Sequence, residues 1–415
     1  MLQTHKRVIL IHVELLKSTE LVQDLCEFRE LAIAAGLKIA AVIACKRESP
    51  EPKYFLGSGK VKEVYECVLA NSANLVIFNH FLSPVQERNL QQLLQCQVLD
   101  RTGLILAIFA QRARSFAGKL QVELAQLEHL ATRLVRGWTH LERQRGGIGL
   151  RGGPGETQLE TDRRILQQKT VYLKKRLTKL TKQRMQNRRA RKRSFLSTIA
   201  LVGYTNAGKS TLFNLLTTAK VYVANKLFAT LDPTLRRIDL PGFGAAVIVD
   251  TVGFIRDLPH ELIEAFHATL EETREADLLL HVVDASDPQK NAKIEIVNKT
   301  LAEIDASHIP QLQVLNKIDL LEGFEPRVDK DMDSFPKRIW LSATNGDGIE
   351  LLLQSIKQVV FPPLEEIELG LLPHACNIRA MFYQNNAVVS EEIDGLGNFH
   401  LKLCIRLRDL AQIFA

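Results

Sequence analysis

FLSTIALVGYTNAGKSTLFNLL, residues 195–216, decides the fold of this 415-residue chain. It reads as an apolar strand, a glycine-rich loop and an apolar helix. Gly203, Gly208, Lys209 and Ser210 complete the pattern G-x4-G-K-S. The glycines let backbone N–H groups turn toward a phosphate chain, the lysine neutralises β- and γ-phosphate charge, and the serine hydroxyl binds Mg²⁺. The stretch predicts an α/β P-loop domain with a mostly parallel sheet and flanking helices, and an ordinary glycine turn is the alternative.

Three further motifs follow strand-like runs downstream. DTVG (250–253) ends AAVIVD, and its Asp250 can hold the magnesium shell through water while Gly253 meets a γ-phosphate. NKID (316–319) follows QLQVL, and the Asp319 carboxylate can accept hydrogen bonds from guanine N1–H and the 2-amino group, which selects GTP over ATP. SAT (342–344) follows RIWL, where its backbone N–H groups lie near the guanine oxygen. Each motif falls at the carboxyl end of a strand, where ligands bind open α/β sheets.

The composition is that of an ordinary globular protein. Hydrophobic residues make up 46% and charged residues 24%, and the length allows two or three domains. Apolar runs are too short for a membrane span, which leaves peripheral membrane association open, and the N-terminus has no secretion signal. The six cysteines form no CxxC pair, which favours reduced thiols over a disulfide framework or metal site. We therefore expect a cytoplasmic protein.

The positive charge is concentrated in one segment. Residues 163–193 carry fourteen Lys or Arg and no Asp or Glu, so subtracting them from the whole-chain charge of +7 leaves −7 on the rest. A helix that is only solvated normally mixes both signs of charge to gain i,i+4 pairs. The run therefore favours contact with a polyanion over the alternative of a solvated helix face. Few aromatic residues interrupt it, so we expect a grip on phosphates and no base stacking.

The rest of the chain divides around the P-loop domain, which we place at 195–361. Residues 1–115 contain four strand-like runs, RVILIHVEL, LKIAAVIAC, NLVIFNH and CQVLDR, with helical patterns between them, which predicts a small α/β domain. Leucines repeat every seven residues on both sides of a glycine-rich stretch, which predicts an antiparallel helical hairpin over 116–194. After Phe361-Pro362-Pro363, strand-like alternation in HLKLCIRLRDL indicates a small C-terminal domain over 374–415.

The glycine-rich stretch GGIGLRGGPGETQLE, residues 146–160, also contains the G-x-G-x-x-G spacing of a dinucleotide-binding loop. Such a loop must leave a strand and open an apolar helix, because the phosphates sit on that helix's N-terminus. Here the glycines follow the charged helix end LERQR and precede Pro154. We therefore interpret the stretch as the tip of the hairpin, where the alternatives are RNA contact and a flexible linker.

Taken together, the chain resembles the HflX GTPases of the Obg–HflX group of translational GTPases over nearly its whole length. The resemblance rests on YFLGSGK (54–60), GGIGLRGGPGETQLETDRR (146–164), GYTNAGKSTLFN (203–214), FATLDPTLR (228–236), DTVGFIRDLP (250–259) and NKID (316–319). It implies a ribosome-associated GTPase that binds the large ribosomal subunit and its rRNA, with a role in ribosome splitting and rescue under stress. It also implies that Thr230 binds Mg²⁺ beside Ser210, although the residues alone leave Thr234 as a rival.

These patterns define the expected site. Catalytic roles fall to Lys209, Thr230 and Gly253, and the metal ligands are Ser210 and Thr230. The expected GTP-binding residues are Gly203, Tyr204, Thr205, Asn206, Ala207, Gly208, Lys209, Ser210, Phe228, Ala229, Thr230, Leu231, Asp232, Asp250, Thr251, Val252, Gly253, Asn316, Lys317, Ile318, Asp319, Ser342, Ala343 and Thr344. The expected RNA contacts are Arg143, Arg145, Arg151, Arg163, Arg164, Lys174, Lys175 and Arg176. Asn206 either holds K⁺ near the phosphates or is a loop asparagine that tolerates a tight turn.

Hydrolysis lacks an obvious water-orienting residue. Ras-like enzymes use a glutamine soon after DxxG, but here Phe254 and Ile255 follow Gly253. We therefore expect slow turnover that the ribosome stimulates. Arg256 is either a charge stabiliser or, as we favour, a surface or RNA contact, and His281 is expected to be a satisfied core histidine. The competing functions are an RNA-remodelling NTPase, for which a second ATP site in the N-terminal domain stays open, and a non-catalytic RNA scaffold. We expect a monomer that does not bind DNA.

Overall fold

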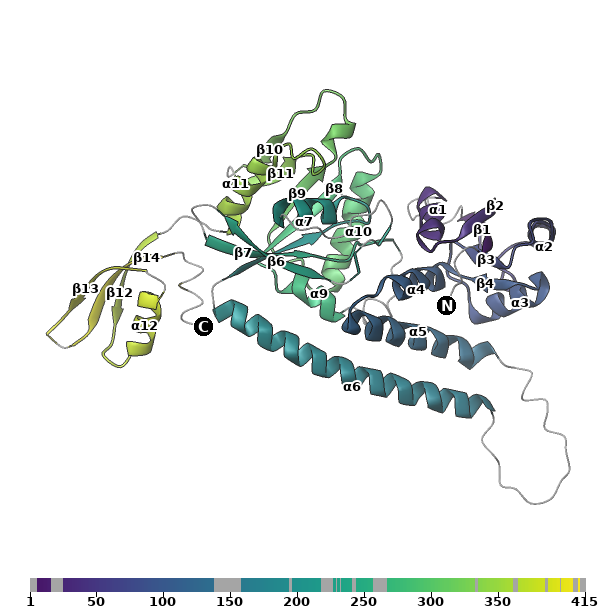
Figure 1. The fold of residues 1–415 in the computed structure, drawn as a ribbon, viewed down its shortest axis with the longest axis horizontal. Helices are drawn as coiled ribbons and strands as arrows, with labels where there is room; N and C mark the ends of the chain where they lie inside the picture. The colour runs from purple at the N-terminus through teal and green to yellow at the C-terminus, as the bar shows by residue number, and fades with distance from the viewer. Residues whose placement is uncertain are drawn as a thin grey trace, which may run out of the picture.

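The computed structural model describes residues 6–15, 25–137, 158–193, 196–217, 227–228, 230–231, 233–240, 244–256, 267–332, 335–360, 365–384, 387–395, 397–405 and 410. Within these residues the strands form a four-stranded, a seven-stranded and a three-stranded sheet, which follow one another along the chain (Figure 1). Most of the glycine-rich stretch lies outside the described residues, as do Arg143, Arg145, Arg151, Ala229 and Asp232.

The N-terminal domain is a parallel sheet with helices on both faces. Its strands are β1 (Arg7–Leu15), β2 (Lys38–Arg47), β3 (Leu75–Phe78) and β4 (Gln97–Leu99), in the order β2-β1-β3-β4. Its helices are α1 (Leu25–Ala34), α2 (Ser58–Asn71), α3 (Pro84–Leu94) and α4 (Arg101–Arg112). Residues from Val8 to Val13 are buried without interruption, as expected where helices cover both faces of a parallel sheet. All four predicted strands are therefore confirmed.

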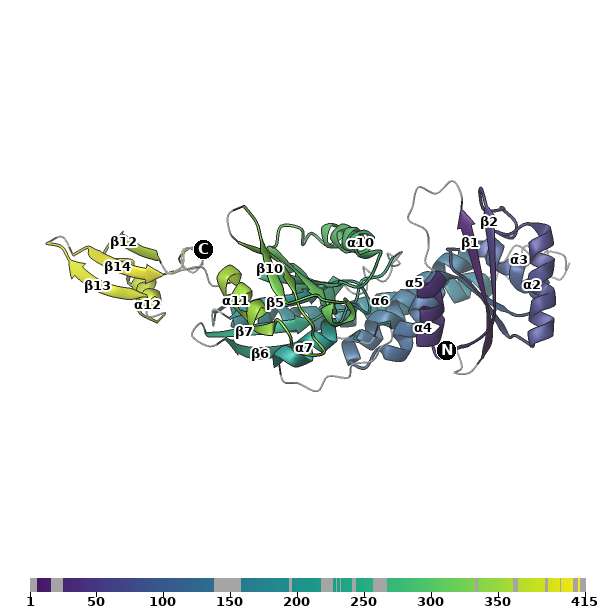
Figure 2. The same ribbon diagram turned by 90° about the horizontal axis from the view of Figure 1, so that it is seen from above.

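The helical hairpin is formed by α5 (Phe116–Gly137) and α6 (Gln158–Arg193), which lie side by side in both views (Figures 1 and 2). The predicted heptad leucines form its seam. Leu120, Leu124 and Leu173 are buried there, with Leu127, Leu177 and Leu180 packed against them. The hairpin prediction is thus confirmed, because an apolar repeat every seven residues keeps one stripe of each helix facing the other.

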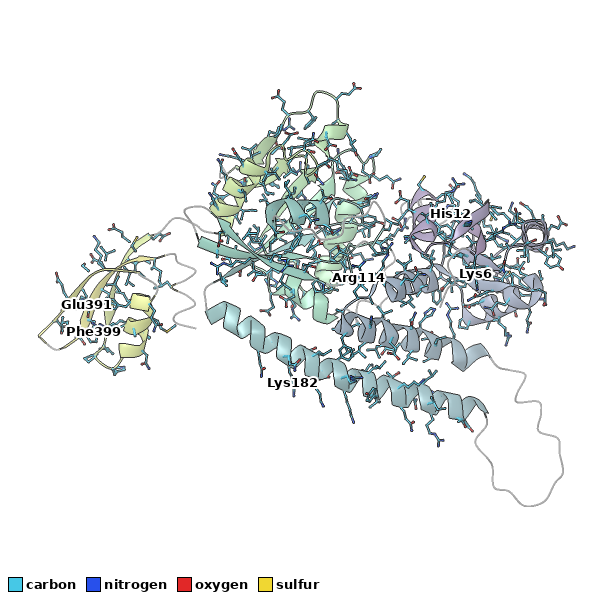
Figure 3. The ribbon with its side chains drawn as sticks, in the orientation of Figure 1. Lys6, His12, Arg114, Lys182, Glu391 and Phe399 are labelled. Atoms are coloured by element: carbon cyan, nitrogen blue, oxygen red, sulfur yellow. The ribbon has the colours of Figure 1, made fainter. Side chains whose placement is uncertain are left out.

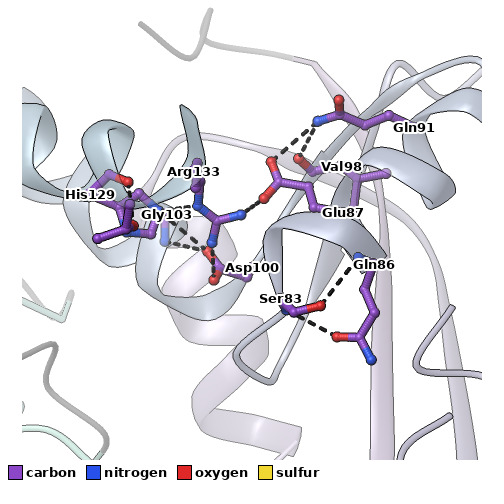
Figure 4. Close-up of polar contacts among 10 residues, drawn as sticks. Ser83, Gln86, Glu87, Gln91, Val98, Asp100, Gly103, His129 and Arg133 are labelled. Carbon is purple, nitrogen blue, oxygen red and sulfur yellow. Dashed lines mark hydrogen bonds and ion pairs between the residues drawn. The ribbon is translucent and has the colours of Figure 1, made fainter. Parts of the chain in front are cut away.

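The hairpin is anchored to the N-terminal domain through α5. Arg133 of α5 forms an ion pair with Asp100, 2.6 Å away, and a second one with Glu87 of α3 (Figure 4). Asp100 also caps α4 by accepting a hydrogen bond from the Gly103 N–H at 2.8 Å. One buried carboxylate therefore joins the end of the sheet, the start of α4 and the hairpin.

The central domain has the predicted P-loop architecture. Its strands are β5 (Ser197–Val202), β6 (Thr234–Leu240), β7 (Gly244–Asp250), β8 (Leu278–Asp284), β9 (Gln311–Asn316), β10 (Arg327–Lys330) and β11 (Pro336–Trp340). The order is β10-β11-β9-β8-β5-β7-β6, and only the edge strands β10 and β6 run antiparallel to their neighbours among the described strands. Its helical elements are α7 (Lys209–Thr217), α9 (His267–Arg274), α10 (Lys290–Glu303), the 3₁₀ helix η2 (Ile318–Leu320) and α11 (Ile349–Val360).

The C-terminal domain is a three-stranded antiparallel sheet with one helix. It comprises β12 (Glu365–Leu371), α12 (Cys376–Gln384), β13 (Val388–Ile393) and β14 (Phe399–Ile405). Arg379 of α12 makes a bidentate ion pair with Glu391, and its guanidinium lies over the ring of Phe399; Figure 3 labels both partners. Because β12 pairs with β14, this sheet begins nine residues before the predicted start at 374. No described helix is long and apolar enough to cross a bilayer.

Candidate nucleotide-binding site

The P-loop connects β5 to α7 through two glycines that have no room for a side chain. Gly203 has a φ of 147°, and a Cβ there would lie 2.2 Å from the carbonyl oxygen of Val282. Gly208 has a φ of 95°, and a Cβ there would lie 2.2 Å from the side-chain nitrogen of Asn316. Positive φ and close backbone approach both require glycine. The two glycines of the motif are thus fixed by the geometry of the loop.

Lys209 begins α7 and is buried beneath the loop. Its ammonium donates hydrogen bonds to the carbonyl oxygens of Gly203 at 3.0 Å and Tyr204 at 2.7 Å. Burial lowers the pKa of Lys209 to about 8, and the nearby Asp250 carboxylate partly opposes this shift. The P-loop therefore holds a cation whose charge is costly until an anion arrives.

Three oxygen-bearing side chains meet at the start of α7. The Ser210 hydroxyl lies 2.7 Å from the Thr230 hydroxyl and donates to Asp250 Oδ2 at 2.7 Å, and Thr230 donates to the same oxygen at 3.0 Å. Asp250 Oδ1 is buried and has no hydrogen-bond partner among the residues that the structure describes. Hydroxyl and carboxylate oxygens of this kind fit Mg²⁺, which keeps several waters and shares its remaining positions with substrate phosphates. Thr234 instead begins β6, where it stands opposite Asp250 in the strand register.

The segment after β7 pairs with the P-loop through its backbone. The Phe254 N–H donates to the Gly203 carbonyl at 3.1 Å, and the Thr205 N–H donates to the Phe254 carbonyl at 2.8 Å. The Phe254 side chain is only 2% exposed, so it serves packing and cannot orient water. A Cβ on Gly253 would lie 3.0 Å from the Lys209 ammonium, which brings the DxxG glycine directly beside the phosphate-binding lysine.

The guanine end of the site is organised by Asn316. Its side-chain amide donates to the Ala207 carbonyl at 2.9 Å, and its oxygen accepts from the Ala343 N–H at 2.9 Å. Ser342 donates to Asp319 Oδ1 at 2.6 Å, which orients that carboxylate. Lys317, with a φ of 68°, pairs with Asp284 at 2.6 Å. The fold thus brings the P-loop, NKID and SAT motifs to one edge of the sheet.

Comparison with known proteins identifies the family. Residues 22–110 match the family described as GTP-binding GTPase N-terminal, residues 112–191 match GTP-binding GTPase Middle Region, and residues 198–317 match 50S ribosome-binding GTPase. The GTPase HflX of Escherichia coli K12 is 54% identical over 408 residues, which cover 98% of this chain and 95% of that protein. The chain belongs to the HflX family of GTPases.

A further relative is less similar, and a solved structure has a limited likeness to this chain. The GTPase HflX of Magnetococcus marinus is 48% identical over 370 residues, which cover 87% of this chain and 84% of that protein. A crystal structure of a GTP-binding protein from Sulfolobus solfataricus in complex with GDP covers 86% of this chain and 98% of its own, with a TM-score of 0.44 and 23% identity. As a member of the HflX family, the protein is a GTPase.

Two residues of the predicted GTP-binding set direct their side chains toward the N-terminal domain. The Tyr204 hydroxyl donates to Glu27 of α1 and accepts from the Arg256 N–H at 3.1 Å. Arg101 of α4 pairs with Glu27 and donates to the Arg256 carbonyl at 3.2 Å. The ring of Phe228 packs on Phe109 of α4, with 4.6 Å between centroids. In this HflX-family chain, both side chains therefore face the neighbouring domain, and the partners Glu27 and Arg101 had no signal in the sequence.

The structure shows the surroundings of His281 and the backbone conformation of Asn206, two residues whose roles the sequence left open. His281 is buried, as predicted, but its Nδ1 has no hydrogen-bond partner among the described residues, so it is not fully satisfied. Burial lowers its pKa to about 4, which keeps the ring neutral. It borders a cavity of about 210 Å³ that Glu27 and Asn206 also line. Asn206 has a φ of 62°, a left-handed conformation that asparagine tolerates.

The described members of the expected RNA contacts all lie on α6. Arg163, Arg164, Lys175 and Arg176 are exposed. Lys174 is also exposed, and it forms an ion pair with Glu128 of α5 at 2.8 Å. Lys182, on the same helix, lies on the side away from the GTPase domain (Figure 3). The cations of the basic run whose side chains the structure describes, from Arg163 to Lys182, are thus all exposed on this one helix.

Proposed function

We propose that this protein is a GTPase of the large ribosomal subunit that hydrolyses GTP to GDP and phosphate and acts in ribosome splitting or rescue under stress. The observation that carries the proposal is the pairing of a complete GTP site with α6. The region matched by the 50S ribosome-binding GTPase family, residues 198–317, holds the P-loop and DxxG parts of the site, and the adjoining helix carries fourteen Lys or Arg and no Asp or Glu in its sequence over 163–193. Such a surface binds rRNA phosphates with strong salt dependence.

Each part of the site has a distinct role in this proposal. Lys209 neutralises the β- and γ-phosphates. Because Gly253 lies beside the Lys209 ammonium, the Gly253 N–H contacts the γ-phosphate. Ser210 and Thr230 would hold Mg²⁺ through their hydroxyl oxygens, and Asp250 would hold it through water. The ion would supply positive charge for the phosphates. The Asp319 carboxylate recognises guanine in the orientation that Ser342 gives it.

The residue that follows Gly253 predicts how hydrolysis is regulated. Phe254 takes the position after Gly253, and its buried ring leaves no polar group there to align water. We therefore expect slow hydrolysis by the isolated protein and acceleration by the large ribosomal subunit, which supplies or orders the missing group. Within this scheme GTP orders the switch segments for docking, and hydrolysis releases the protein.

The remaining assignments complete the proposal. We place the domains at 1–115, 116–194 and 195–361, followed by the C-terminal domain, in a cytoplasmic monomer that does not bind DNA. Potassium is assigned to Asn206 as a hypothesis to be tested. Its left-handed backbone supports the simpler role of a turn residue, so the ion has to be demonstrated independently.

The test is GTP turnover by the purified protein, alone and with large ribosomal subunits, with ATP in parallel and with KCl exchanged for NaCl at matched ionic strength. We expect stimulation that is specific to GTP and absent in Lys209→Ala. Rapid turnover without ribosomes would overturn the account of Phe254, and equal ATP turnover would favour an RNA-remodelling NTPase. Equal rates in KCl and NaCl would remove the potassium role of Asn206.

A further inference from the structure

Two exposed aromatic rings on the hairpin each contact the same arginine. Phe116, at the start of α5, is 54% exposed, and Tyr172, in the first half of α6, is 57% exposed. The guanidinium carbon of Arg176 lies 4.9 Å from the centroid of the Phe116 ring and 5.5 Å from that of Tyr172. Arg176 also donates a hydrogen bond to the Tyr172 hydroxyl at 3.1 Å. We call these three residues the aromatic–arginine cluster.

The cluster lies within a face of α6 where cations and apolar groups alternate. Ile165, Lys169, Tyr172 and Arg176 follow one another at spacings of four, three and four residues, which places them on one side of the helix. Lys169 and Arg176 are exposed one turn to either side of Tyr172. An RNA strand whose phosphates contact Lys169 and Arg176 would therefore pass the planar ring of Tyr172 between these two contacts.

From these contacts we propose that the aromatic–arginine cluster binds an unpaired RNA base by stacking. The inference rests on the proposed RNA-binding role of α6 and names the form of RNA that this surface takes. Aromatic rings and arginine planes are the groups on which proteins stack splayed-out bases, whereas paired bases keep their faces inside the duplex. The charge of α6 argues for a polyanionic occupant over an apolar protein surface.

This conclusion revises the expectation from the sequence. The basic run contains few aromatic residues, which predicted contacts to phosphates without stacking. Fifty-six residues separate Phe116 from Tyr172 in the sequence, and the antiparallel pairing of α5 and α6 brings both to Arg176. The second ring, that of Phe116, therefore comes from α5, so the sequence of α6 alone does not reveal it.

The experiment compares single-stranded and duplex RNA on the full-length protein. The probes are a fluorescein-labelled adenosine dodecamer and a twelve-base-pair RNA duplex, each titrated at several salt concentrations. In Tyr172→Leu the ring is lost but an apolar, helix-compatible side chain is kept. We expect the variant to bind the single strand roughly 5- to 100-fold more weakly with an unchanged salt slope, and to bind the duplex as the unaltered protein does.

Two matched variants separate stacking from charge. Tyr172→Trp restores a planar ring and should restore single-strand affinity. Lys175→Ala removes a neighbouring exposed cation, so it should weaken both probes and reduce the salt slope by about one contact. Unaltered single-strand affinity in Tyr172→Leu, or an equal loss on both probes, would overturn the stacking inference alone. Failure of the unaltered protein to bind either RNA would overturn the RNA role of α6 as well.

Discussion

Replacing Asn316 should strongly reduce the folding stability of the nucleotide-free GTPase domain. It is 2% exposed, and its two hydrogen bonds of 2.9 Å join the P-loop at Ala207 to the SAT loop at Ala343. Asn316→Ala leaves one buried carbonyl and one buried N–H without partners, at about 1–3 kcal/mol each. For a domain of this size, a loss of about 2–6 kcal/mol lowers the melting temperature by roughly 4–24 °C.

Scanning calorimetry of the full chain with and without GDP provides the measurement. The transition that GDP shifts to higher temperature belongs to the GTPase domain, because a ligand stabilises only the unit that binds it. Ser355→Ala is the matched control, since Ser355 is also buried but its hydroxyl donates to Leu351 within its own helix and joins no two described loops. A fall of less than about 2 °C in Asn316→Ala would refute the reasoning, because it would mean that neither orphaned group costs free energy.

Three other perturbations test separate parts of the site. Burial lowers the pKa of Lys209 to about 8, so the nucleotide-free protein loses this charge as the pH rises. Because the unfolded chain keeps the proton up to about pH 10.5, the free energy of unfolding should increase between about pH 8 and 10.5. The GTP affinity, measured by calorimetry, should fall roughly fourfold from pH 7.0 to 8.5, because the protonated fraction of Lys209 falls by that factor. A pH-independent affinity would contradict this. Asp319→Asn should weaken GTP binding by roughly 100-fold or more through two lost charge-assisted bonds, and should gain xanthosine triphosphate, whose 2-oxygen accepts the new amide N–H; retained guanine selectivity in a competition assay would exclude the assigned role. Gly203→Ala should abolish the GDP-dependent rise in melting temperature, whereas Gly59→Ala, where a Cβ meets nothing within 4 Å, should not alter it.

Much of the nucleotide site was predictable because phosphate recognition constrains a continuous backbone segment. The spacing of Gly203, Gly208 and Lys209 specifies a strand, a tight loop and a helix before any tertiary contact is known. The DxxG, NKID and SAT segments follow strands of one parallel sheet, so their convergence is a consequence of topology. Of the two threonines that the sequence left open, Thr230 is hydrogen-bonded to Ser210 and Asp250, which supports its proposed role as a magnesium ligand.

The contacts between distant segments were not predictable in this way. Glu27 and Tyr204 are 177 residues apart, and neither has a local pattern that indicates a partner. Phe116 looks like an ordinary apolar residue at a helix start until α6 brings Arg176 to it. The C-terminal sheet was placed too late because the glutamates of EEIELGL obscure a strand whose alternate residues Ile367 and Leu369 pack into a small core. In each case the deciding information is tertiary.

The continuity of α6 has a mechanical consequence. The helix has 36 residues, so at 1.5 Å per residue it is about 54 Å long, and only three residues separate its end at Arg193 from β5, the strand that carries the P-loop. A rod of this length amplifies rotation, because a tilt of about 5° at the GTPase end displaces the other end by roughly 5 Å. That distance approaches one nucleotide step along an RNA strand. If α6 binds RNA as proposed, a tilt of this size would therefore move its far end by a distance comparable with that step.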